Sequence, residues 1–189
     1  MEKLFTVTFT TGATAVAVQV SQRDNLATLL GNMGLEQNRP VLVVVGGASK
    51  LVEKSFERVR QLFAHVLAPL AQKWGATVID GGTDVGVMRL MGQARQEVGG
   101  TFPLVGVIPI ELAILPDRAN ATPDAAPLEP NHTHFVLIPG SNWGDESVWI
   151  ADVASALTNV SDSLTVLING GEIAWQDASE SVKDDRSLV

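Results

Sequence analysis

The chain has no cysteine among its 189 residues. Disulfides and cysteine nucleophiles are therefore excluded, and a zinc site would have to use histidine and carboxylate ligands alone. No apolar run approaches the ~20 residues that a membrane-spanning helix requires. Residues 1–10 lack the basic start and apolar centre of a signal peptide. We therefore expect no membrane partner and a cytoplasmic location.

Basic residues are also scarce, with 13 Lys and Arg against 21 Asp and Glu and a net charge of −8. They form no cluster, and a nucleic-acid partner would require a basic face. A small anionic ligand is still compatible with this charge. A hydrogen bond to a charged group contributes about 1.5–3 kcal/mol, whereas an unpaired charge ~10 Å away contributes about 0.4 kcal/mol in water.

Hydrophobic residues make up 46% of the chain, which is typical of a globular domain with a sizeable core. The segment Val41–Val45 is apolar at every position. A strand that is apolar on both faces belongs in a parallel sheet covered on both sides. We expect further strands at 76–79, 104–108, 135–138 and 164–168, and helices at 52–70, 85–99, 145–157 and from 173 onward. This order predicts an α/β, doubly wound and mainly parallel sheet.

The N-terminal segment, residues 1–38, has a different pattern. Residues 4–10 and 13–20 are expected to form a β-hairpin around Thr11-Gly12, and Asp24 can cap a short helix that ends near Gly34. We expect this part to pack on the main domain, residues 39–189, within a single domain overall. Residues 187–189 look like the start of one more strand, so a truncated C-terminal end is expected.

Glycine turns follow four predicted strands, at residues 46–47, 81–82, 140–144 and 170–171. In a parallel sheet they lie at one edge, where open α/β sheets bind ligands. Uncovered glycine backbone and the free N–H groups of a following helix favour an anion. The second turn leads into a helix for which Thr83 and Asp84 are suitable caps. Its glycines match neither G-x-G-x-x-G nor a P-loop. Together, the turns predict an anion or nucleotide site.

Two other groups of polar residues have side chains that can take part in metal binding or catalysis. His132 and His134 would face the same way in an extended segment, but only Glu129 lies near as a third ligand. We therefore expect no metal site, and instead hydrogen-bonded imidazoles at a loop-to-strand corner. Asp145 and Glu146 open a predicted helix, where carboxylates suit the dipole; a catalytic role stays open. The proline-containing segment 111–131 is predicted to be a long loop that could act as a lid.

Four segments occur together in an order that resembles a known family. They are Val44-Val45-Gly46-Gly47-Ala48, Gly81-Gly82-Thr83-Asp84-Val85-Gly86-Val87-Met88, Leu128-Glu129-Pro130-Asn131-His132-Thr133-His134-Phe135-Val136-Leu137, and Val166-Leu167-Ile168-Asn169-Gly170-Gly171. The chain resembles the N-terminal cytosolic homology region of melastatin-type TRP channels, whose prokaryotic relatives form the SLOG or LSDAT superfamily. The match spans residues 40–175.

The resemblance implies a Rossmann-like domain that senses a nucleotide-derived ligand such as ADP-ribose, without a required cofactor. It implies that the ligand touches residues on all four glycine turns. These are Gly46, Gly47, Ala48, Gly81, Gly82, Thr83, Met88, Gly140, Ser141, Asn142, Gly170 and Gly171. The family usually continues into a strand that ends in a Gly-x-Gly-Arg turn, which this chain ends before.

Two other functions remain open. Related LOG enzymes cleave nucleotide 5′-monophosphates between base and ribose, and their signature is Pro-Gly-Gly-x-Gly-Thr-x-x-Glu. Here the corresponding segment is Pro139-Gly140-Ser141-Asn142-Trp143-Gly144-Asp145-Glu146, in which the Thr is missing and no acid stands at the matching spacing. In a hydrolase of this kind, the acid would be Glu146 or Asp145. Alternatively, the chain is an interaction module with a vestigial pocket. Trp143 and Trp149 would then be interface residues, Trp143 could equally stack on a base, and a homo-oligomer is possible.

Overall fold

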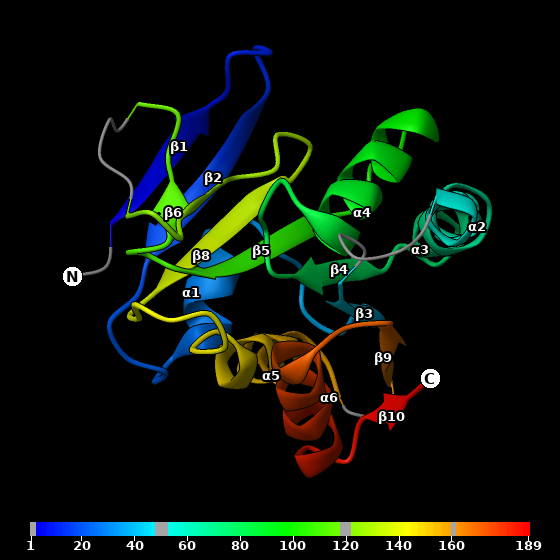
Figure 1. Cartoon of the computed structure of the whole chain (residues 1–189). Coiled ribbons are helices and arrows are strands. Elements are labelled where there is room, and N and C mark those ends of the chain that lie inside the picture. Colours follow the sequence, from blue (N-terminus) through cyan, green and yellow to red (C-terminus); the bar gives the residue numbers. More distant parts are fainter. Residues whose placement is uncertain (1–2, 48–52, 118–121, 160–161) are drawn as a thin grey trace.

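A computed structural model describes residues 3–47, 53–117, 122–159 and 162–189. Eight strands form one sheet in the order β1-β2-β8-β5-β4-β3-β9-β10 (Figure 1). The strands are β1 (Leu4–Thr8), β2 (Thr14–Gln19), β3 (Val41–Gly46), β4 (Thr77–Asp80), β5 (Leu104–Pro109), β8 (His134–Ile138), β9 (Ser163–Ile168) and β10 (Ser187–Leu188). Neighbouring strands are parallel except β1 and β2. The predicted α/β fold class is confirmed.

Helices cover both faces of the sheet, as expected for a doubly wound fold (Figure 1). On one face lie α1 (Leu26–Asn32), α5 (Ser147–Leu157) and α6 (Glu172–Lys183). On the other lie α2 (Glu53–Leu62), η1 (Phe63–Leu67), α3 (Ala68–Trp74) and α4 (Gly86–Glu97). None of the helices in the described ranges is long and apolar enough to cross a membrane.

Alternation along β3 explains why its sequence is apolar throughout. Val43 and Val45 pack into the core under α1 and α5, whereas Val44 packs into the core under η1 and α4. Successive side chains of a strand point to opposite faces, so a strand between two helical layers needs apolar residues at every position. The same division places Ile79 and Val78 of β4 in the two different cores.

The N-terminal hairpin is an integral edge of the main sheet. β2 pairs in parallel with β8, and Gly12 has a φ of +86° in the turn between β1 and β2. Ala17 and Val18 of β2 are fully buried. The predicted cap at Asp24 is wrong. Asn25 precedes α1 in a left-handed conformation, and no side chain caps the helix, whose first residue, Leu26, is buried.

The helix predicted at 52–70 is divided into three parts. α2 passes into the π-helical segment η1, and α3 then continues with Pro69 in its first turn. Proline has no N–H and its ring crowds the preceding turn, so a wider turn just before Pro69 has a local cause. Gly75 ends α3 in a left-handed conformation with φ of +61°.

The segment predicted as a long loop, residues 111–131, carries structure where it is described. β6 (Ala113–Ile114) pairs in parallel with β7 (Ala126–Pro127), and Leu128 forms a bridge with Thr83. Leu115 and Leu128 are buried in a third core with the hairpin and β8. Residues 118–121 lie outside the described residues. The described parts of this segment that form β6, β7 and the bridge at Leu128 are therefore packed on the domain.

The strand order reverses at β3. From β3 the chain proceeds through β4 and β5 to β8 on one side, and α5 then leads back to β9 on the other side of β3. This reversal is the topological switch point of an open α/β sheet, where a crevice forms outside the carboxyl ends of the strands.

Candidate functional site

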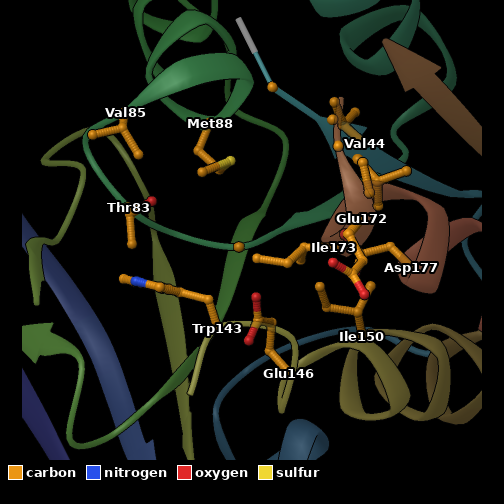
Figure 2. A pocket seen from close by; sticks show the side chains of 16 residues that line it. Val44, Thr83, Val85, Met88, Trp143, Glu146, Ile150, Glu172, Ile173 and Asp177 are labelled. Carbon is orange, nitrogen blue, oxygen red and sulfur yellow. The ribbon is translucent and has the colours of Figure 1, made fainter. Parts of the chain in front are cut away.

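A pocket of about 400 Å³ lies over the carboxyl ends of β3 and β4, beside the switch point (Figure 2). Its walls come from the turns after β3 and β4, the start of α4, the start of α5 and the start of α6. The lining residues are Val44, Val45, Gly46, Gly47, Gly81, Thr83, Val85, Met88, Trp143, Glu146, Ile150, Gly171, Glu172, Ile173, Ala174 and Asp177. Elements that are distant in sequence thus meet around one space.

The structure brings together part of the set of residues that the sequence suggested. Gly46, Gly47, Gly81, Thr83, Met88 and Gly171 line the pocket, and so does Glu146. Gly82, Gly140, Ser141, Asn142 and Gly170 do not line it, and neither does Asp145. Ala48 lies outside the described residues. Of the two acids suggested for a hydrolase, only Glu146 therefore reaches the pocket.

Several turn amides that were predicted to be free for an anion instead donate hydrogen bonds to carboxylates of the chain itself. The N–H of Gly82 donates to Asp80 Oδ1 at 2.7 Å. The N–H groups of Ser141 and Asn142 both donate to Asp145 Oδ2 at 3.0 Å. The N–H of Gly144 likewise donates to Glu146 Oε2 at 2.9 Å. A short acidic side chain beside a turn satisfies these donors locally, so the expectation of free amides is wrong at these positions.

The predicted caps of α4 are also wrong. Val85 is the residue before the helix, and no side chain caps it. Asp84 instead accepts a hydrogen bond from Arg89 Nε at 2.7 Å. Thr83 is 1% exposed, and its Oγ1 has no hydrogen-bond partner among the described residues. Bridge pairing with Leu128 holds the Thr83 backbone at the pocket wall and away from the cap position.

Gly82 has a packing role that the sequence analysis did not foresee. Its φ is +69°, and a Cβ at this position would lie 2.8 Å from the Cα of Gly106 on β5. The same Cβ would lie 3.2 Å from the ring of Phe135. The turn after β4 therefore needs glycine for its conformation and for the close approach of β5, independently of a ligand.

Carboxyl groups dominate the polar lining of the pocket. Glu146 and Asp177 are 7% and 9% exposed, and Figure 2 shows both at the pocket, one from the start of α5 and one from α6. Burial raises the pKa of Glu146 to about 7, and the nearby charges of Asp177 and Asp145 add to this effect. Burial also raises the pKa of Asp177 to about 6, although the hydroxyl of Ser147 donates to it at 2.5 Å and opposes the shift. Both groups therefore titrate near neutral pH.

A second buried polar cluster, formed by His132, Asp80 and Glu129, holds the turn after β4. The His132 ring nitrogens lie 2.8 Å from Asp80 Oδ1 and 2.8 Å from Glu129 Oε2. Burial disfavours the imidazolium, but the charges and hydrogen bonds of Asp80 and Glu129 outweigh it and raise the His132 pKa to about 9. His132 is therefore cationic at neutral pH and donates from both nitrogens. Because Asp80 also accepts from Gly82, this cluster fixes the turn.

His134 has separate surroundings. Its Nδ1 lies 2.7 Å from Thr133 Oγ1, and its Nε2 lies 3.2 Å from the carbonyl oxygen of Met33. His132 precedes β8 whereas His134 begins it, so the two rings do not share an extended segment. Among the described residues, no group of three histidine or acidic side chains is placed to hold a metal ion. Both imidazoles are hydrogen-bonded at a loop-to-strand corner, as predicted.

Two tryptophans suggested as interface residues make contacts within the chain. Trp143 lines the pocket, and its Nε1–H donates to the carbonyl oxygen of Asp124 at 3.2 Å. Trp149 packs against the core under α1 and α5. The exposed tryptophans are Trp74 and Trp175, at 59% and 66%. Trp143 is thus available to a ligand in the pocket.

Comparison with known families finds a match over residues 39–189 to the family described as SLOG in TRPM, prokaryote. The chain belongs to this SLOG family. The resemblance that four sequence segments indicated is thereby confirmed. The match begins after the N-terminal hairpin and α1, so those elements lie outside the matched part.

A curated relative supports the same assignment. The Transient receptor potential cation channel subfamily M member-like 2 of Nematostella vectensis is 31% identical over 147 residues. The match covers 66% of this SLOG chain and 9% of the channel. The chain thus spans a small part of that relative's length.

Two solved structures resemble the fold. A structural-genomics target, TM1055, aligns with a TM-score of 0.51 and 19% identity over 79% of this chain and 72% of that chain. The molybdenum cofactor binding protein from Rippkaea orientalis aligns with a TM-score of 0.48 and 14% identity over 80% of this chain and 75% of that chain. The first likeness supports a Rossmann-like fold alone, and the second carries no argument about this protein.

Sequence reasoning missed the contribution of α6 to the pocket. Ala174, Asp177, Ala178 and Ser181 form the buried face of this helix at helical spacing. Asp177 is therefore a carboxylate on an otherwise small and weakly polar face, and this irregularity is a readable signal. Most of the other lining residues that were not predicted are apolar, and in the sequence they look like ordinary core residues: Val44, Val45, Val85, Ile150, Ile173 and Ala174. The exposed Glu172 was also not predicted.

Proposed function

We propose that this SLOG domain senses a nucleotide-derived small molecule, such as ADP-ribose, by binding it in the pocket at the switch point. The observation that carries the proposal is the convergence of Gly46, Gly47, Gly81 and Gly171 on one partly open pocket beside β3. Family membership supports the same interpretation.

The size and lining of the pocket are compatible with such a ligand. Its volume of about 400 Å³ falls in the ~300–1,000 Å³ range of small-molecule sites. Trp143 offers an aromatic face for a base, and Met88 and Ile173 add apolar walls. Glu146 and Asp177 offer oxygen atoms for ribose hydroxyl or base amino groups.

Calorimetry with ADP-ribose, NAD, AMP and cyclic ADP-ribose tests the proposal. Ile173→Trp should fill the pocket and weaken binding at least about tenfold, because Ile173 lines it and is only 38% exposed. Val182→Trp is the matched control, since Val182 lies on the same helix, is 53% exposed and does not line the pocket. Binding of none of these ligands, or binding that Ile173→Trp leaves unchanged, would contradict the proposal.

A second candidate function is hydrolysis of a nucleotide between base and ribose. It is favoured by Glu146, whose burial raises its pKa to about 7, so that it can hold a proton near neutral pH. The test is base release from AMP, followed by chromatography. Glu146→Gln should abolish release while Asp145→Asn, outside the pocket lining, should reduce it far less. AMP that stays intact on prolonged incubation would exclude this activity.

A further inference from the structure

The helices α2 and α3 and the segment η1 between them carry a largely apolar row of side chains, which we name the outer stripe. Its members recur at every fourth residue and are Arg58, Leu62, Val66, Leu70 and Trp74. The exposed fraction is 37% for Leu62, 41% for Val66 and 59% for Trp74. Contiguous apolar surface that is open to water commonly marks a site of interaction.

The π-helical segment η1, Phe63–Leu67, keeps the outer stripe on one side of the helix. A spacing of four exceeds the about 3.6 residues of an α-helical turn, so such a row winds gradually around a regular α-helix. A π-helical turn holds more residues and therefore rotates the row back. Figure 1 shows α2 and α3 at the outer end of the layer that they form with α4. The outer stripe thus forms one continuous face at the side of the molecule.

An apolar groove adjoins the C-terminal half of the outer stripe. It has a volume of about 230 Å³ and lies between α3 and the strands β3 and β9. Leu70 and Trp74 of the stripe line one side of it, and Leu42, Leu164 and Val166 of the sheet line another. These three residues of the sheet are only partly buried. An apolar side chain that approaches along the outer stripe would therefore find a recess beside Leu70.

The order of side chains along the outer stripe is symmetric about Val66. Leu62 and Leu70 stand four residues to either side of it, and Arg58 and Trp74 stand eight residues to either side. In a twofold dimer, residue i contacts residue j of the other copy and residue j contacts residue i. Two stripes packed antiparallel about Val66 therefore place Leu62 on the other copy's Leu70, at the groove, and Arg58 on the other copy's Trp74.

The charges at the two ends of the outer stripe are complementary in the same arrangement. A guanidinium over an indole face is a favourable cation–π contact, and a twofold dimer forms the contact between Arg58 and Trp74 twice. Glu57 lies beside Arg58 at one end, Lys73 lies beside Trp74 at the other, and both are exposed. Antiparallel packing brings these opposite charges near each other, whereas parallel packing would bring Arg58 to Arg58. The stripe therefore fits a second copy of this chain in one orientation.

We propose that the outer stripe is the interface of a homodimer, in which two copies of the chain pack antiparallel with Val66 at the twofold axis. Leu62 of each copy then enters the groove of the other copy. The groove is lined by residues at the amino ends of β3 and β9, whereas the pocket of the proposed function lies at the carboxyl ends of β3 and β4. The proposal is therefore independent of the proposed ligand.

Analytical ultracentrifugation of the full chain measures the oligomeric state. At about 100 µM, far above a micromolar dissociation constant, the wild type should sediment as a dimer. Val66→Glu should raise the dimer dissociation constant at least about a hundredfold, because two like charges would meet at the twofold axis. Val182→Glu is the matched control, since it makes the same change at an exposed position of α6 and should leave the dimer intact. A monomeric wild type, or a dimer that the folded Val66→Glu variant retains, would overturn the proposal.

Single cysteines map the axis, because the chain has no cysteine of its own. A disulfide joins two positions only where their Cα atoms lie within about 7 Å of each other. Under mild oxidation, Val66→Cys should form a covalent dimer rapidly, whereas the control Val182→Cys should not. Leu62→Cys and Leu70→Cys should cross-link better when mixed than either variant alone, because each position faces the other. A mixture without this advantage, or equal cross-linking of Val66→Cys and Val182→Cys, would overturn the proposed packing.

Discussion

His132 links the end of β4 to the segment before β8 through two carboxylates. Its side chain is fully buried, and it stacks on Phe135 with ring centroids 5.4 Å apart. The His132 imidazolium, Asp80 and Glu129 form a buried ionic network. Removing any one of the three would leave a buried charge without its partner. The residue therefore acts on the pocket indirectly, by holding the turn that carries Gly81 and Thr83.

Replacing His132 by alanine should destabilise the protein by about 3–5 kcal/mol, because two buried carboxylates would lose their cationic partner. Urea denaturation at pH 7 measures this loss. In the wild type, the folded-state pKa of about 9 lies above the ordinary value of 6.5, so the stabilisation is fully present below pH 6.5 and is lost as the pH rises through 9. A wild-type stability that does not decline over that range would contradict the charge assignment.

Glu146 makes the folded state less stable as the pH rises, because its buried carboxyl group then becomes charged. Its folded-state pKa of about 7 exceeds the ordinary 4.5, so its stabilising effect is complete below pH 4.5 and is lost as the pH rises through 7. The groups that face it are Asp177, Asp145 and the N–H of Gly144.

Glu146→Gln should therefore stabilise the fold at about pH 8 by on the order of 2–3 kcal/mol, and have little effect at about pH 4.5. The amide oxygen of glutamine can still accept from Gly144. Thermal unfolding at the two pH values measures the difference. If the variant were equally destabilised at both pH values, the charged Glu146 carboxylate would have to be stabilised by its hydrogen bonds in the folded protein.

At the scale of single elements, α4 shows how packing reverses a local preference. Gly92 lies within this helix, where alanine would ordinarily be favoured by about 1 kcal/mol. A Cβ at Gly92, however, would lie 2.1 Å from the carboxylate of Glu129. The helix therefore needs glycine here to approach the cluster of His132, Asp80 and Glu129.

Gly92→Ala should destabilise the protein by about 2 kcal/mol or more, since either Glu129 or the helix must move. The control is Gly31→Ala in α1, where nothing lies within 4 Å of the added Cβ. That substitution should be neutral or stabilising by up to about 1 kcal/mol. Urea denaturation of both variants measures the contrast, and equal effects would refute the steric explanation.

The sequence predicted most strands to within one or two residues, because apolar runs between glycine turns depend only on local pattern. The predicted strand at 41–45 became β3, Val41–Gly46, and that at 164–168 became β9, Ser163–Ile168. Helix starts were predicted about as closely, but the capping residues were not. Thr83 and Asp84 have the chemistry of caps, but contacts with Leu128 and Arg89 determine what they bind. Leu128 is distant from Thr83 in the sequence, and Arg89 is not one of the residues that a capping motif includes, so the sequence pattern does not predict either contact.

For the molecule as a whole, the hairpin and the main domain share one core. Val18 of β2 is 0% exposed and packs in the core that also contains Leu30 of α1 and Val153 of α5. The backbone of β2 pairs with that of β8 from Val16 to Gln19. We therefore expect residues 1–38 and 39–189 to unfold together.

Val18→Asp should destabilise the entire domain by several kcal/mol, because a carboxylate would be buried without a partner. The four tryptophans lie at positions 74, 143, 149 and 175, all outside the hairpin. Tryptophan fluorescence and far-UV circular dichroism should therefore shift together in urea. A fluorescence transition that the substitution leaves unchanged would show that the hairpin unfolds separately.

The sequence alone determined the α/β class, the alternation of strands and helices, and the family, because these depend on periodicity and on short motifs that are read locally. Only the tertiary structure decided which turns meet at β3, that own-chain carboxylates occupy the turn amides, and that Asp177 of α6 joins Glu146 in the pocket. Strand order and the approach of helices bring these groups together across the chain. No local pattern encodes the distance between side chains that far apart in sequence.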